Sequence, residues 1–155
     1  RAFITNDWEV ESSDLKLLER LLDDQFPLNS KILLEEPIDF GIPNAANLTQ
    51  QVSYKKYTET ESIIEVKTNQ PAVLFISDTW YPGWEAYIDG KKERIYRANF
   101  AFRAIPIPEG LHQVRMIYRP ESFFLGLRIS GACLILIIFL VIFSKIGKTS
   151  FSRYT

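Results

Sequence analysis

A long uncharged stretch near the C-terminal end divides this chain into two parts of different character. Ile129 to Phe143 reads ISGACLILIIFLVIF. Adding Phe123–Leu127 across Arg128 gives about 21 residues, the length that a helix needs to cross the hydrocarbon core. Arg128 then lies near one end, where its side chain can reach the head groups. Because the stretch lacks a polar face, a buried helix of a soluble protein is disfavoured, and we expect a membrane-spanning helix over residues 121–145.

Basic residues flank this predicted span on both sides. It is followed by Lys145, Lys148 and Arg153 and preceded by Arg115, Arg119 and Arg128. The charge asymmetry is therefore small, but large domains translocate largely regardless of charge. We expect residues 146–155 to be a cytoplasmic tail and residues 1–120 to be extracytoplasmic. The chain starts at Arg1 without a signal peptide, so we interpret it as the C-terminal piece of a longer protein.

The soluble part combines one predicted helix with many short predicted strands. A helix over about residues 14–24 is indicated by leucines at helical spacing after a capping serine, Ser12 or Ser13, and Pro27 stops it. A loop is indicated at Asp39–Thr49 (DFGIPNAANLT). The predicted strands are Ala2–Val10 (with a turn at Asn6-Asp7), Lys31–Glu35, Gln51–Tyr57, Ser62–Thr68, Ala72–Ser77, Trp84–Ile88, Glu93–Tyr96, Phe100–Ile105 and Leu111–Tyr118. Strands of this length and spacing favour an antiparallel β-sandwich or jelly roll.

Asp89-Gly90 is a strong hairpin signal, joining Trp84–Ile88 to Glu93–Tyr96. It lies in the most aromatic part of the chain, the run from Ser77 to Gly110. There Trp80, Tyr81 and Trp84 surround a predicted tight corner at Pro82-Gly83. These three rings could pack on Tyr96 or Phe102, meet the rest of the protein or the bilayer surface, or stack on sugars.

The residues suited to catalysis or metal binding are few. His112 is the one histidine, Cys133 is the one cysteine and falls in the predicted span, and the net charge is −1 with scattered basic residues. No zinc-type cluster, nucleophile elbow, Gly-rich phosphate loop or basic stripe for nucleic acid is present in the sequence. Asp78 and Asp89 are explained by turn chemistry, which leaves Glu85 without a partner for glycosidase chemistry. We predict no catalytic residue, metal, cofactor or nucleic-acid partner for this chain.

The candidate binding residues are those that cluster at the aromatic corner and on the strands after it. They are Trp80, Tyr81, Trp84, Arg97 and Arg103. Arginines suit phosphate or carboxylate groups near a membrane, although a solvated strand face is an alternative explanation for both of them.

Several blocks of this sequence resemble the C-terminal region of the bacterial YfhO family of membrane proteins. They are Arg1-Ala2-Phe3, Asn6-Asp7-Trp8, Ser77–Trp84 (SDTWYPGW), Tyr87–Gly90 (YIDG), Tyr96–Ala104 (YRANFAFRA), Pro108–His112 (PEGLH) with Val114, and Tyr118–Phe123 (YRPESF). The resemblance covers nearly the whole chain and is most specific between Ser77 and Phe123.

This resemblance implies a multi-pass membrane protein with a large extracytoplasmic domain near its C-terminus. It also implies a likeness to GT-C glycosyltransferases, which transfer a sugar from an undecaprenyl-phosphate carrier to a cell-envelope glycopolymer such as lipoteichoic acid. The catalytic carboxylate of such enzymes lies on an early loop that is not in this chain. We therefore expect a non-catalytic accessory domain whose partners are membrane lipid and the upstream transmembrane bundle. The undecaprenyl-phosphate sugar and the cell-envelope glycopolymer are further candidate partners. A tethered carbohydrate-binding module, or a purely structural one, is the alternative.

Overall fold

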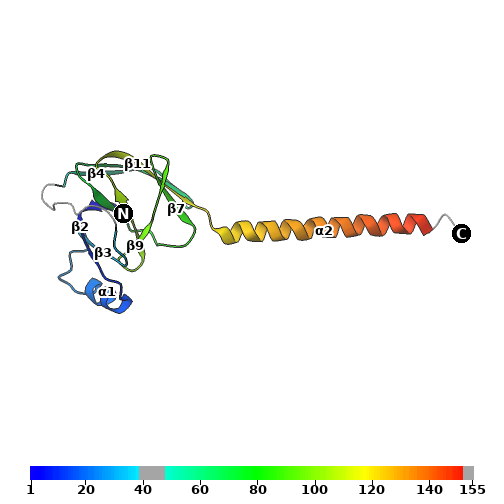
Figure 1. Ribbon diagram of the computed structural model, residues 1–155, viewed down its shortest axis with the longest axis horizontal. Helices are drawn as coiled ribbons and strands as arrows, with labels where there is room; N and C mark the ends of the chain where they lie inside the picture. Colours follow the sequence, from blue (N-terminus) through cyan, green and yellow to red (C-terminus); the bar gives the residue numbers. More distant parts are fainter. Residues whose placement is uncertain (39–47, 152–155) are drawn as a thin grey trace. The chain divides into compact units, whose positions relative to one another are not determined.

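The computed structural model describes residues 1–38 and 48–151 (Figure 1). The chain divides into two compact units, Arg1–Arg119 and Pro120–Thr155. The first is mainly β with a short helix, and the second contains one long helix. The expected fold class is thus confirmed. The predicted loop at Asp39–Thr49 lies, up to residue 47, outside the described residues.

The strands of the first unit form two sheets. Sheet A has the order β1-β6-β10-β9-β3-β2. Its strands are β1 (Ala2–Thr5), β6 (Ala72–Ile76), β10 (Phe102–Ile107), β9 (Tyr96–Ala98), β3 (Lys31–Leu34) and β2 (Asp7–Val10). Sheet B has the order β4-β5-β11-β7-β8. Its strands are β4 (Gln50–Tyr57), β5 (Glu61–Thr68), β11 (Gly110–Tyr118), β7 (Trp84–Ile88) and β8 (Lys91–Glu93). The pairings are antiparallel in the described residues, apart from the parallel pair β2 and β3.

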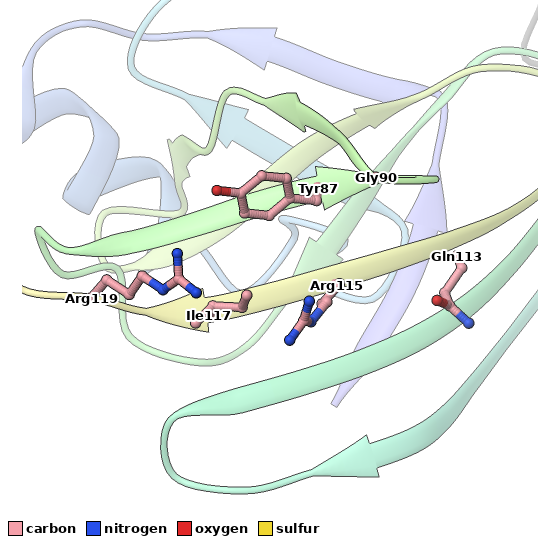
Figure 2. Close-up of a pocket in the computed structure, with 6 residues that line it drawn as sticks. All are labelled: Tyr87, Gly90, Gln113, Arg115, Ile117 and Arg119. Carbon is pink, nitrogen blue, oxygen red and sulfur yellow. The ribbon is translucent and has the colours of Figure 1, made fainter.

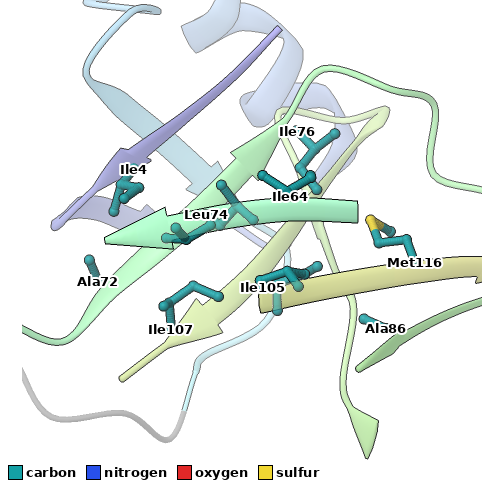
Figure 3. Packing of buried hydrophobic residues seen from close by; sticks show 11 residues of the cluster. Ile4, Ile64, Ala72, Leu74, Ile76, Ala86, Ile105, Ile107 and Met116 are labelled. Carbon is teal, nitrogen blue, oxygen red and sulfur yellow. The ribbon is translucent and has the colours of Figure 1, made fainter. Parts of the chain in front are cut away.

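The two sheets pack face to face over a shared apolar core, which makes this unit a sandwich (Figure 3). Alternate residues of each strand point into it, as the period of two requires. Sheet A contributes Ile4, Ala72, Leu74, Ile76, Ile105 and Ile107, and sheet B contributes Ile64, Val66, Ala86, Val114 and Met116.

A second apolar cluster lies on the other face of sheet A. It includes Phe75 and Ala104 from the middle of the sheet, with Phe3 of β1 and Trp8 of β2 packed against it. These two strands occupy opposite edges of the sheet, yet only Asn6 separates them in the chain. Sheet A therefore curls around this second cluster. The single N-terminal strand predicted over Ala2–Val10 is two strands with different partners.

Helix α1 (Asp14–Leu21) lies near β2 and β3 (Figure 1), and its Leu17 is fully buried. Arg20 forms an ion pair with Glu9 of β2, and Lys31 of β3 pairs with the same carboxylate. The helix ends at Leu21, earlier than predicted, because the side chain of Asp23 bonds the backbone just after it. The Asp23 Oδ1 accepts the Gln25 N–H at 2.9 Å, a local hydrogen bond that competes with a further helical turn.

Two more predicted strands differ from the structure by more than one residue. The strand predicted at Glu93–Tyr96 is divided between β8 in sheet B and β9 in sheet A, and Ile95 packs on the sandwich core where the chain crosses over. The strand predicted over Phe100–Ile105 starts later, at Phe102, because Phe100 has a positive φ of 68°, and it continues through Pro106 to Ile107. Strand β9 pairs with β10 only at Phe102–Ala104, so beyond that point one side of β10 is an edge where a missing N–H is tolerated.

The second unit is built on helix α2 (Glu121–Phe151). Its segment Glu121–Ile142 spans 22 residues and is long and apolar enough to cross a membrane. At 1.5 Å per residue this segment is about 33 Å long, close to the thickness of the hydrocarbon core. The described apolar side chains around the helix are exposed, as expected of side chains that face lipid. The boundaries predicted for the span and the cytoplasmic tail stay predictions.

Candidate functional site

The aromatic corner is the link between β6 and β7, and backbone hydrogen bonds fix it at two points. The N–H of Trp80 donates to the carbonyl of Ala101 at 2.7 Å, and the carbonyl of Gly83 accepts from the N–H of Arg119 at 2.6 Å. Gly83 has a φ of 104°, a conformation that glycine adopts without steric cost. The corner is thus tied both to the β9–β10 loop and to the residue that follows β11.

Arg103 and Trp84 join the two sheets beneath this corner. Arg103 lies on β10 of sheet A and is only 5% exposed, and its guanidinium carbon is 4.0 Å from the ring centroid of Trp84 on β7 of sheet B. Its Nε and Nη2 both donate to the carbonyl of Thr79, at 2.9 and 2.7 Å. Burial lowers the pKa of Arg103, and the nearby Asp78 partly offsets this effect. The buried charge is therefore satisfied by a carbonyl and an aromatic face.

Tyr118, at the end of β11, lies between two rings of the corner. Its centroid is 5.4 Å from Trp84 and 6.4 Å from Tyr81. Tyr81 is 61% exposed, so it presents an aromatic surface that rests on an ordered base. Trp84 packs on the sandwich core, whereas Tyr96 and Phe102 pack on the second cluster. Trp84 therefore packs on Tyr118 rather than on Tyr96 or Phe102, the two rings considered in the sequence analysis.

Arg97 forms an ion pair with Glu35, which is not a residue of the corner. Arg97 lies directly opposite Arg103 in the β9–β10 pair, so both side chains leave the same face of sheet A. Its Nε is 3.0 Å from Oε1 of Glu35, it donates to the carbonyl of Phe100, and its guanidinium lies over the Phe100 ring. Burial raises the pKa of Glu35, and the attraction of Arg97 only partly offsets that effect.

A polar cluster lies next to Arg103 at the same end of the sandwich. Asp78 accepts a hydrogen bond from Arg1 Nε at 3.1 Å, and the single Tyr57 hydroxyl lies 3.3 Å from each of its two carboxylate oxygens. Arg1 also lies over the Tyr57 ring, 3.9 Å from its centroid. Nearby, burial and the charge of Asp78 raise the pKa of Tyr54 to about 12.

The carboxylates near the corner are engaged in pairs that stabilise their charged forms or order turns. Glu85 accepts from Lys92 at 2.6 Å and from the Tyr87 hydroxyl at 3.0 Å, and these bonds lower its pKa. Asp89 accepts the Gln113 N–H at 2.8 Å and faces His112 Nδ1 at 2.6 Å, which lowers its pKa as well. Low pKa values do not suit general acids, which work with raised ones. Residues 1–38 and 48–151 contain no group of three or more His, Cys, Asp or Glu that could hold a metal ion.

Sequence reasoning missed a hollow on the outer face of sheet B (Figure 2). The hollow has a volume of about 410 Å³ and is lined by Tyr87, Gly90, Gln113, Arg115, Ile117 and Arg119. A signal for it was present in β11, where core residues alternate with Gln113, Arg115 and Ile117. That alternation places these three side chains on one face, but the sequence does not reveal that β7 brings Tyr87 opposite Arg115.

The structure therefore brings together some of the five predicted binding residues and separates others. Trp84 and Arg103 are in contact, and Tyr81 reaches Trp84 through Tyr118. Trp80 is joined to the β9–β10 loop through its backbone, and Arg97 pairs with Glu35. Ligand binding by these residues stays a prediction.

Comparison with known protein families identifies a match for this chain. The family described as "Bacterial membrane protein YfhO" matches residues 41–130, which is more than half of the 155-residue chain. No match to the chain was found among curated proteins or among solved structures. The matched region includes the aromatic corner, Arg97, Arg103 and the first part of α2. The chain is a membrane protein and belongs to the bacterial YfhO family.

Proposed function

We propose that this chain is the C-terminal accessory domain and last membrane span of a multi-pass membrane glycosyltransferase. The whole protein would transfer a sugar from an undecaprenyl-phosphate carrier to a cell-envelope polymer such as lipoteichoic acid. In this proposal the β unit is extracytoplasmic and holds the acceptor polymer near the active site. Membership of the YfhO family supports the proposal, together with a helix long enough to anchor the unit in a membrane.

The observation that carries the acceptor-holding role is the exposed ring of Tyr81 above an ordered base. Tyr81 rests on Tyr118, Tyr118 on Trp84, and Trp84 on the buried Arg103. Such support holds the ring in place before a ligand arrives, so little conformational entropy is lost on binding. The C–H-rich face of a sugar packs well on an aromatic ring presented in this way.

The carboxylates near the corner support an accessory role rather than a catalytic one. Asp78 bonds Arg1 and Tyr57, and Glu85 bonds Lys92 and Tyr87. Each therefore has partners within the unit that would have to be displaced before the carboxylate could act on a substrate. We assign the catalytic carboxylate to a part of the complete protein upstream of this chain.

The test uses the complete membrane protein and measures sugar transfer to the envelope polymer. Tyr81→Ala and Trp80→Ala should lower transfer several-fold at unchanged protein level. Leu111→Ala is the matched control, because Leu111 is also exposed (63%) and lies outside the corner. Unchanged sugar transfer by the Tyr81→Ala and Trp80→Ala proteins would contradict the proposal that the corner holds the acceptor. A complete sequence with a single upstream signal segment, instead of many spans, would favour a tethered carbohydrate-binding module.

A further inference from the structure

The hollow on the outer face of sheet B is built from regularly paired positions. Arg115 on β11 lies directly opposite Tyr87 on β7, and Ile117 lies opposite Glu85. Val114 and Met116 point into the sandwich core, so Gln113, Arg115 and Ile117 point outward. Figure 2 shows Gln113, Arg115, Ile117 and Arg119 following one another along the chain, with Tyr87 on the neighbouring strand. Two rigid strands therefore fix the positions from which these side chains reach the hollow.

Positive charge exceeds negative charge around this hollow, although Glu65 lies directly opposite Gln113, because Glu65 is itself paired with Lys55 at 2.9 Å. Glu61 accepts from Arg115 Nε at 2.8 Å and is also paired with Lys56, so one carboxylate faces two cations. Glu85 is bonded to Lys92 and also lies in the field of Arg119. The pKa values of Glu61 and Glu85 are lowered, mainly by their hydrogen bonds to the lysines. Both carboxylates are therefore negatively charged in this charge balance. The remaining positive charge favours an anion.

The lining suits an anion that also carries hydroxyl groups. Guanidinium groups bind phosphate oxygens in a forked geometry, and the amide of Gln113 can both donate and accept hydrogen bonds. Tyr87 and Ile117 add apolar surface beside them. A phosphodiester attached to a small polyol matches this combination of charge, hydrogen-bonding groups and apolar surface.

The position of Arg119 in the chain indicates where such a phosphate comes from. Only Pro120 separates Arg119 from Glu121, the first residue of α2, so the two Cα atoms are at most about 8 Å apart. The apolar span begins within that first turn, at Phe123. Basic residues immediately outside a span attract anionic lipid head groups, at about 1 kcal/mol for each residue.

We propose that the hollow formed by Tyr87, Gln113, Arg115, Ile117 and Arg119 binds the phosphate of an anionic phospholipid head group. The proposal does not depend on the transferase role, because it requires only that α2 lies in a membrane.

The test uses the whole chain in a neutral detergent, with the arginine Nε–H signals followed by NMR. Dihexanoyl phosphatidylglycerol is the anionic probe, and dihexanoyl phosphatidylcholine is the zwitterionic one. The Arg115 and Arg119 signals should move and saturate with the anionic lipid, and the zwitterionic lipid should have little effect. Glucose 1-phosphate and inorganic phosphate test a soluble source of the same chemistry, and they should bind more weakly.

Variants sharpen the test, since they change charge on an exposed face and spare the core. Arg115→Gln and Arg119→Gln should each weaken binding about fivefold, and the double variant about 30-fold. The matched control removes two exposed charges outside the lining of the hollow, Lys16→Gln with Arg94→Gln, and should leave the affinity within about twofold of the original.

Three results would overturn the proposal. One is equal binding of the two lipids. Another is a control variant that loses as much affinity as the arginine double variant, because binding would then reflect net charge alone. The third is tighter binding of glucose 1-phosphate than of phosphatidylglycerol, which would assign the hollow to a soluble sugar phosphate.

Discussion

Arg103 of sheet A is stacked on Trp84 of sheet B, with 4.0 Å between the guanidinium carbon and the ring centroid. Arg103, which the sequence analysis predicts as a ligand-binding residue, thus makes its contacts mainly with other residues of the protein. Its two donated hydrogen bonds end on the carbonyl of Thr79, in the same corner that presents Tyr81. We infer that the pair supports any ligand bound at the corner by holding Trp84 and Thr79 in place.

Arg103→Met should lower the free energy of unfolding by about 2–4 kcal/mol. The change leaves the Thr79 carbonyl without its donors and removes the cation–π contact. Chemical denaturation of the whole chain in detergent, followed by tryptophan fluorescence, measures the effect. Arg94→Met is the control, because that side chain is 60% exposed, and it should cost less than about 1 kcal/mol. Equal losses in the two variants would contradict the structural role of Arg103.

Asn99 combines an unusual backbone conformation with a buried hydrogen bond, and two substitutions separate these contributions. Its φ is 44°, and its Oδ1 accepts the Leu33 N–H at 2.7 Å. Asn99→Gly loses the acceptor but tolerates the backbone, so it should cost about 1–2 kcal/mol of unfolding free energy. Asn99→Ala also adds strain and should cost about 1 kcal/mol more. The same denaturation experiment decides this, and equal costs for alanine and glycine would show that strain is unimportant here.

The pair of His112 and Asp89 should make stability depend on pH. His112 Nε2 also lies 3.1 Å from the Glu109 carbonyl, so both ring nitrogens face acceptors. Burial opposes the charged ring, but the hydrogen bonds to Asp89 and Glu109 outweigh it and raise the pKa of His112. The Gln113 N–H and His112 lower the pKa of Asp89. The histidine's contribution is complete below its unfolded pKa, about 6.5, and is lost as the pH rises through the raised folded value.

The aspartate's contribution runs in the opposite direction. It is present above the unfolded pKa of about 3.9 and is lost as the pH falls through the lowered folded value. The pair therefore stabilises most between about pH 4 and 6.5. The difference in unfolding free energy between the original chain and His112→Gln should be largest near pH 5.5, at about 0.5–1 kcal/mol, and smaller at pH 8.5. An equal difference at both pH values would contradict this coupling.

A charge in the middle of α2 should impair membrane insertion, and one at its start should not. Leu136 is 57% exposed and lies well inside the candidate span Glu121–Ile142. Leu136→Arg should cost about 2.5–3.5 kcal/mol of apparent insertion free energy. Ser122→Arg is the control, since its side chain can reach the head groups. A translocation assay with glycosylation tags on either side of α2 reports both. Normal insertion of Leu136→Arg would argue against a lipid-facing position.

The predicted strands are most accurate where alternation is regular and turn residues are unambiguous. Trp84–Ile88 is exact, and Leu111–Tyr118 and Ser62–Thr68 each start one residue late. In these strands the pairing with adjacent strands and the positions of the core residues both follow the alternation seen in the sequence. The long apolar stretch was equally informative, because few structures other than a helix can bury a continuous uncharged segment of that length in lipid.

The sequence was less informative wherever the chain passes from one sheet to the other. The hairpin predicted at Asp89-Gly90 is confirmed by the pairing of β7 with β8, but its second strand is short. The chain then crosses between the sheets, with Ile95 packed on the sandwich core and Tyr96 already in sheet A. The edge position of Pro106 in β10 depends on how far β9 extends, which is a property of tertiary pairing. Similarly, the contact of Arg103 with Trp84 joins residues of different sheets, which no local pattern encodes.

The order of strands in sheet B determines how mechanical load enters the protein. Strand β11 is paired on both sides, with β5 and with β7, and it is the strand that continues toward α2. A pull from the membrane anchor therefore acts along two hydrogen-bonded ladders at once, in shear. A pull on β1, which is paired only with β6, acts on a single ladder at the edge of sheet A. We therefore expect tension along the chain to detach β1 before β11.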